Sequence, residues 1–221
     1  IGNNGGGNVT ISGGNVFGKS GAYISWNNSS MLNISGGEVS SDGYTLVNYG
    51  IVNITGGTIS TTREDKVCIS SNSMVLNVSG GTLQHVKVNQ VNISGDPIVK
   101  IALGSLTSKK VSIIGELTGE AGDIILTGKG LTTTNEGTVV ATAENEAHAD
   151  ASKFSLIDLE DKILSKDGSN IVIASNTFDL SNGSVTIDNN GEYTITQSGD
   201  GPTSNTVTIN SDATIYLDGV D

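Results

Sequence analysis

Apolar residues alternate with Asn, Ser and Thr in short stretches that end at a pair of glycines. The pattern apolar-x-apolar-Ser/Thr-Gly-Gly occurs at 9–14, 32–37, 52–57 and 76–81, and a fifth copy at 91–95 has Asp96 in place of the second Gly. Weaker copies end at Gly115 and Gly128. A side-chain period of two predicts strands, and glycine supplies the positive φ that tight turns need. Recurrence roughly every twenty residues predicts stacked coils, and strand-like return segments favour a parallel β-solenoid over a leucine-rich repeat.

Stacking the copies separates each strand into an inward and an outward face. We expect two aliphatic columns in the core: Ile11, Ile34, Ile54, Val78 and Ile93, and then Val16, Val39, Ile59, Leu83 and Ile98. The outward positions are Thr10, Asn33, Asn53, Asn77 and Asn92. The repeat makes all four of these asparagines Asn-x-Ser/Thr sequons, and we interpret them as a structural ladder.

The repeat divides the chain into three parts. Residues 1–128 are predicted to form a parallel β-helix, and residues 129–177 a less regular segment that closes it. That segment has a possible short helix at 144–152 and a hairpin turn at 166–169. Strands resume at 178–221 without the Ser-Gly-Gly mark, and we expect the opening coils of a second module there. Open strand edges invite pairing, so a head-to-tail contact with neighbouring modules is expected.

Charge, the length of the apolar runs and cysteine content limit the partners that can be expected. The net charge of −12 repels phosphate backbones, so nucleic acid is not expected as a partner. No apolar run approaches the roughly 20 residues of a membrane helix, so no membrane insertion is expected. Cys68 is the only cysteine and is interpreted as structural.

The run at 5–16, Gly-Gly-Gly-Asn-Val-Thr-Ile-Ser-Gly-Gly-Asn-Val, resembles the Gly-rich repeats of large bacterial cell-surface proteins of the pectate-lyase-like β-helix type. The run at 191–220 resembles the opening coils of such a module. The resemblance covers most of 1–128 and 178–221. It implies an all-β, right-handed parallel β-helix on a secreted or cell-surface protein, adhesin-like or carbohydrate-binding.

Catalytic and metal-binding patterns are weak. Pectate-lyase-like enzymes use a basic residue on a Ca²⁺-bound acidic sugar, but the single Arg63 stands between repeats beside carboxylates. His85 and His148 have no partners at zinc spacing. We expect no catalytic residues and no resident cofactor. Acidic clusters leave a Ca²⁺ site open; they are Asp158, Glu160 and Asp161, and Glu116, Glu120 and Asp123.

Aromatic residues gather between the second and third repeats. Trp26, Tyr49, Tyr23 and Tyr44, with Asn27, form either a platform on which a sugar ring stacks or a cap on a corner of the core. The sequence leaves both interpretations open.

The function expected is therefore a non-enzymatic surface module that displays or binds a polysaccharide or host glycan. The alternative is a β-helix polysaccharide lyase or glycoside hydrolase. A weaker alternative is an ice-binding solenoid, for which Thr rather than Asn would be expected to dominate the outward face.

Overall fold

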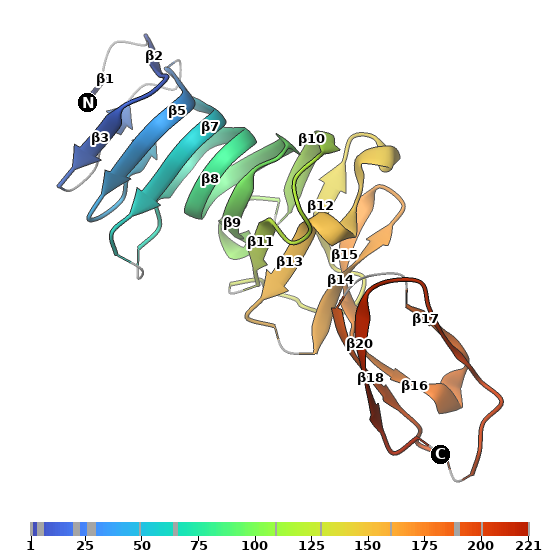
Figure 1. Cartoon of the computed structure of the whole chain (residues 1–221). Helices are drawn as coiled ribbons and strands as arrows, with labels where there is room; N and C mark the ends of the chain where they lie inside the picture. Colours follow the sequence, from blue (N-terminus) through green and yellow to red (C-terminus); the bar gives the residue numbers. More distant parts are fainter. Residues whose placement is uncertain are drawn as a thin grey trace.

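A computed structural model describes residues 2–3, 7–19, 23–25, 30–48, 50–63, 66–108, 110–128, 130–159, 161–187, 191–199 and 201–220. These residues form an all-β solenoid of about 8 turns, which confirms the predicted fold class. The coils follow one another in sequence order along an elongated stack, with β1–β3 at one end and β16–β20 at the other (Figure 1). None of the helical segments among the described residues is long and apolar enough to span a bilayer.

Three walls make up the stack. The first wall consists of β2 (Asn8–Ile11), the beginnings of β5 (Met31–Ser41) and β7 (Ile51–Thr61), two stretches of β8 (Ile69–Gly95), β10 (Val111–Leu117) and β12 (Val139–Ala143). The second consists of β3 (Asn15–Gly18), the ends of β5 and β7, the middle of β8, β9 (Ile98–Ala102), β11 (Ile124–Thr127) and β13 (Phe154–Ile157). The third consists of β1 (Gly2–Asn3), β4 (Tyr23–Ser25), β6 (Leu46–Asn48) and the start of β8. All of these pairings are parallel.

The predicted core column of the first wall is confirmed. Ile11, Ile34, Ile54 and Val78 are partners in successive strands, and Ile93 begins a further run through Ile113 to Ala143. Each of these side chains is at most 7% exposed. Each coil buries its apolar face mainly against its neighbours, so stability is expected to be spread along the stack.

The predicted second column is wrong at its last member. Leu83 pairs with Val99, which is 1% exposed, whereas Ile98 pairs with Thr82 and is 46% exposed. Leu83 stands three residues after Gly80, but Val99 stands four after Gly95. Asp96 and Pro97 in place of a second glycine thus add one residue, and a slip of one residue exchanges the two faces of a strand.

This register predicts opposite sensitivities at two adjacent residues. Val99→Ala should lower the free energy of unfolding by about 2 kcal/mol because it leaves a cavity in the core. Ile98→Ala should stay within about 0.5 kcal/mol because its side chain is on the surface. Urea unfolding followed by circular dichroism measures both changes in the free energy of unfolding. A larger loss for Ile98→Ala than for Val99→Ala would support the register predicted from the sequence, in which Ile98 faces the core.

The parallel stack of the first wall ends at an antiparallel hairpin. Strands β14 (Lys162–Asp167) and β15 (Asn170–Ser175) pair through a two-residue turn at Gly168 and Ser169, as predicted, and β15 lies antiparallel on β12. The segment at 144–152 contains no α-helix. Two 3-10 turns, η2 (Glu146–His148) and η3 (Ala151–Lys153), take its place.

The last segment has a core of its own. Strands β16 (Thr177–Asp179), β18 (Gly191–Thr196) and β20 (Ala213–Asp218) form one parallel sheet, and β17 (Val185–Ile187) and β19 (Val207–Ile209) form another. Four residues make up its buried cluster: Leu180, Ile187, Tyr193 and Ile195. Asp179 links two strands' ends in this segment, because its carboxylate accepts from the Ser198 hydroxyl at 2.6 Å. This hydrogen bond, together with backbone N–H donors, lowers the pKa of Asp179 to about 2. The proposed module boundaries stay a prediction.

Candidate functional site

A ladder of asparagine side chains runs along the outer face of the first wall. The Nδ2 of Asn53 donates to the Oδ1 of Asn33 at 2.9 Å. Asn77 donates to Asn53 in the same way at 2.8 Å, and Asn92 donates to Asn77 at 2.7 Å. Parallel strands lie roughly 4.8 Å apart, which brings amides in register within hydrogen-bonding range. The structural ladder predicted from the repeat is confirmed.

The ladder continues as a polar row at both ends. Thr10 is the partner of Asn33 on one side, and Ser112 and Thr142 follow Asn92 on the other. The Thr142 hydroxyl then donates to the Oδ1 of Asn170 in the closing hairpin at 2.9 Å. Polar side chains in register therefore extend from β2 to β15.

The ladder leaves hydrogen-bonding capacity unused. An asparagine amide carries two N–H donors and an oxygen with two lone pairs. Asn53 and Asn77 each use one donor and one acceptor position along the ladder. These side chains are half-buried, so part of each amide is open to solvent, and the ladder bonds hold it in one orientation. Groups already held in place lose less entropy when they bind a ligand.

Two columns of different chemistry flank the ladder. On one side Met31, Ile51 and Val75 are partners in adjacent strands, and Ile51 is 38% exposed. On the other side, each strand continues from the ladder into a hydroxyl residue: Ser35, Thr55, Ser79 and Ser94. These are exposed or half-buried. On the coils of Asn33, Asn53 and Asn77, the outer face is therefore a ribbon with an apolar edge, an amide centre and a hydroxyl edge. On the Asn92 coil the apolar edge gives way to Gln90, whose Nε2 donates to the Oδ1 of Asn92 at 3.2 Å.

Two hollows open on this face. One, of about 330 Å³, is lined by Asn53, Thr55, Asn77, Ser79, Ser94 and the exposed Ile114, with the backbone between them. The other, of about 520 Å³, lies on the side of the ladder that carries Val75 and has a mostly polar lining: Val75, Asn89, Gln90, Thr107, Ser108, Lys110 and Ser112. Lys110 is the only charged residue in either lining. The sequence pattern did not predict these hollows.

The aromatic corner predicted from the sequence lies mostly outside the described residues. Trp26, Asn27 and Tyr49 are not among them, and Tyr23 is described only by its backbone in β4. Tyr44 is described and is 46% exposed. The choice between a sugar platform and a core cap therefore stays a prediction.

The candidate metal ligands do not assemble among the described side chains. No group of three His, Cys, Asp or Glu residues that could hold a metal is found in that part of the chain. Asp123 instead braces a turn, since its carboxylate accepts from the backbone N–H of Glu120 at 2.7 Å. Arg63 is exposed in the loop after β7. The Ca²⁺ site therefore stays an open expectation.

Cys68 is a core residue. Its side chain is fully buried, and the thiol donates to the carbonyl oxygen of His85 at 3.0 Å. Burial raises the pKa of Cys68 from 9.0 to about 11.

We therefore expect the Cys68 thiol to be protected from alkylation in the folded protein. Only the thiolate reacts, and this shift lowers the thiolate fraction roughly a hundredfold at mildly alkaline pH, before any steric protection. Labelling with iodoacetamide should be slow in the native protein and fast in urea. Equal rates would contradict this burial.

A larger hollow, of about 690 Å³, lies between the closing hairpin and the last segment. Its floor includes Ile163 of β14 and the stacked rings of Phe178 and Tyr193, whose centroids are 6.1 Å apart. Ile163 packs against the core of the last segment, so the floor is shared between the two parts. We call the region around this hollow the joint between the closing hairpin and the last segment.

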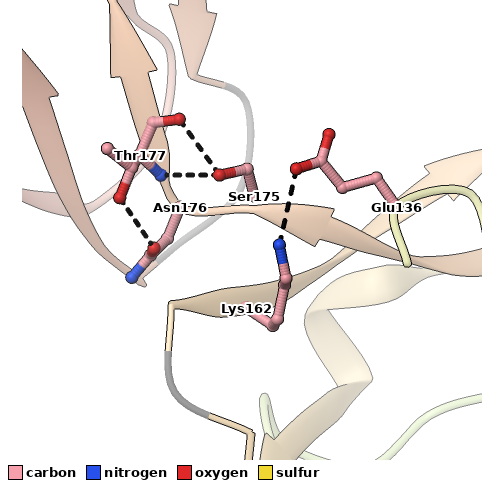
Figure 2. Close-up of polar contacts among 5 residues, drawn as sticks. All are labelled: Glu136, Lys162, Ser175, Asn176 and Thr177. Atoms are coloured by element: carbon pink, nitrogen blue, oxygen red, sulfur yellow. Dashed lines mark hydrogen bonds and ion pairs between the residues drawn. The ribbon is translucent and has the colours of Figure 1, made fainter. Parts of the chain in front are cut away.

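Polar contacts brace the chain at this joint (Figure 2). Lys162 and Glu136 form an ion pair at 3.4 Å. In the turn between β15 and β16, the Thr177 N–H donates to the Ser175 hydroxyl at 3.1 Å, and that hydroxyl donates to the Thr177 carbonyl oxygen at 3.0 Å. An exposed ion pair adds little stability, so the turn and the shared apolar floor are expected to hold the joint.

Comparison with family models, with curated proteins and with solved structures finds no match. The chemistry of the outer face therefore rests on its own residues.

Proposed function

We propose that this chain is a non-enzymatic, adhesin-like extracellular module that binds or displays glycan on the outer face of its first wall. The observation that supports this is the ribbon itself: ordered amides between an apolar and a hydroxyl column. Sugars combine apolar C–H faces with hydroxyl groups that donate and accept, so they suit such a surface. The extracellular location rests on the resemblance of the Gly-rich repeat.

A lyase or hydrolase is the alternative. Glycoside hydrolysis ordinarily needs two carboxylates that flank the scissile bond. The described members of the three columns are Asn, Ser, Thr and apolar residues without a carboxylate. This composition favours binding over cleavage on this face.

A glycan array tests the proposal, run with and without Ca²⁺ and with two matched variants. Thr55 and Thr58 are both exposed, lie in β7 and flank the Gly56-Gly57 corner, but Thr55 is on the first wall and Thr58 on the second. We expect Thr55→Glu to weaken binding at least tenfold and Thr58→Glu to leave it unchanged. Because both variants add the same charge, a difference between them locates the site.

Two results would contradict the proposal. One is the absence of binding to every glycan. The other is robust release of unsaturated products or reducing ends from bound polysaccharides, which would favour the enzyme.

A further inference from the structure

We propose that the ligand of this face is a linear, uncharged polysaccharide of extended 1,4-β-linked pyranose units, which lies along the solenoid axis with one sugar per coil. This inference rests on the proposed function and specifies its ligand. It follows from the spacing of the ladder, the order of the three columns and the distribution of charge.

The amides of the ladder are spaced by one coil. The three ladder bonds are 2.7–2.9 Å long and run from each coil to the next, so equivalent amides recur at regular intervals from Asn33 to Asn92. Their direction is the stacking direction of the coils, in which neighbours are roughly 4.8 Å apart. An extended chain of 1,4-β-linked pyranoses advances by a similar distance per sugar. Such a chain can place one sugar on each coil. Successive sugars are turned over relative to each other, so the two edges of the ring alternate from coil to coil, and each edge carries hydroxyl groups. A 1,4-α-linked chain curves away instead.

The order of the columns matches the shape of a pyranose unit. Ile51, with Met31 and Val75, offers apolar contact to the C–H surface of the rings. Thr55 and its equivalents offer hydroxyls on the opposite side of the ladder. The ladder bonds leave each amide at least one donor and one acceptor position, although the Asn92 oxygen also accepts from Gln90. A pyranose chain that packs one C–H face on the apolar column and turns a hydroxyl-bearing edge toward the amides and hydroxyls contacts all three columns.

The charge distribution favours an uncharged chain. The protein carries a net charge of −12, which repels polyanionic glycans. The ribbon and its hollows provide only Lys110 to offset this repulsion among the described residues. The described side chains of the three columns include no carboxylate that would attract a cationic glycan either. An uncharged polymer avoids both costs.

Repeated contacts give a chain-length signature. Four coils carry ladder asparagines, namely those with Asn33, Asn53, Asn77 and Asn92. Each added sugar that reaches another coil should strengthen binding by roughly three- to tenfold, the range for one modest hydrogen bond. The gain should level off once the ligand covers the ladder and the polar positions next to it.

Titration calorimetry on the whole chain tests this with cello-oligosaccharides from the disaccharide to the hexasaccharide. Malto-oligosaccharides of equal length change only the anomeric linkage. Oligogalacturonates, which are 1,4-α-linked like the malto series, also carry a carboxylate on every sugar. We expect affinity to rise with length for the cello series alone. Thr55→Glu should remove that rise, and Thr58→Glu should preserve it.

The outcomes separate this inference from the proposed function. Affinity that is independent of length, or equal for the cello and malto series, would overturn the axial 1,4-β ligand. Binding of oligogalacturonates that is stronger than that of the malto series, which shares their α linkage, would overturn the neutrality of the ligand. If other glycans on the array bind through Thr55 while all three series fail, the inference is wrong and the proposed function stands. Failure of every glycan overturns both.

Discussion

Alanine at Gly57 is expected to lower the free energy of unfolding by about 4 kcal/mol. Gly57 has φ +85°, a left-handed conformation that costs an L-residue roughly 1–2 kcal/mol. An added Cβ would also lie 2.8 Å from the carbonyl oxygen of Gly37 and 2.9 Å from the carbonyl carbon of Gly36. These are backbone atoms of the preceding coil. Relief therefore requires the coils to separate, and overpacking of this kind adds roughly 1–3 kcal/mol.

Gly14 separates the two causes. It occupies the same position of the repeat and has φ +76°, but no described atom lies within 4 Å of its added Cβ. Gly14→Ala should therefore cost only the conformational part, about 1–2 kcal/mol. Urea unfolding, together with amide exchange of the affected coil, measures both changes. Equal losses at Gly14 and Gly57 would show that coil stacking does not restrict this corner.

Much of the fold was predictable because it depends on a pattern of residues that are close together in the sequence. The alternation of apolar and polar residues predicted both faces of the first wall, and the shared Asn position predicted the ladder. The prediction was wrong at Ile98 because one inserted residue reverses a strand's faces without changing its composition. The hairpin turn at 166–169 was predicted, but the pairing of β15 with β12 was not. That pairing joins segments about thirty residues apart, and no local pattern specifies it.

The candidate site was predicted less well than the fold. The asparagines were recognised as a ladder, but the binding ribbon proposed around them depends on their neighbours across coils. The hydroxyl-side hollow gathers Thr55, Ser79 and Ile114 from three coils, where the ladder register shifts near the glycine corners. These shifts depend on how the coils stack, which spacing along one chain does not show.

Aspartate at position 77 is expected to destabilise the protein by about 2–3 kcal/mol near neutral pH. Asn77 donates to the Oδ1 of Asn53 at 2.8 Å and accepts from Asn92 at 2.7 Å. An aspartate can still accept from Asn92, but it sets a carboxylate oxygen against the carbonyl oxygen of Asn53. The ladder then loses one hydrogen bond and gains a repulsive contact between two acceptors at a half-buried position.

The pH dependence of this variant identifies the cause. Repulsion from Asn53 raises the pKa of the new carboxyl in the folded state above its unfolded value of about 3.9. A protonated carboxyl donates to Asn53 and restores the ladder. The deficit should therefore be small below the unfolded pKa and grow as the pH rises through the folded pKa.

Asn8→Asp provides the control, since Asn8 is exposed and lies beside the ladder column. It adds the same charge to a chain that already carries −12, without opposing two acceptors. Urea unfolding of both variants at neutral and acidic pH measures the difference. Equal deficits at the two positions, or a deficit at Asn77 that persists on acidification, would mean that the amides do not stabilise the wall as a directional chain of donors.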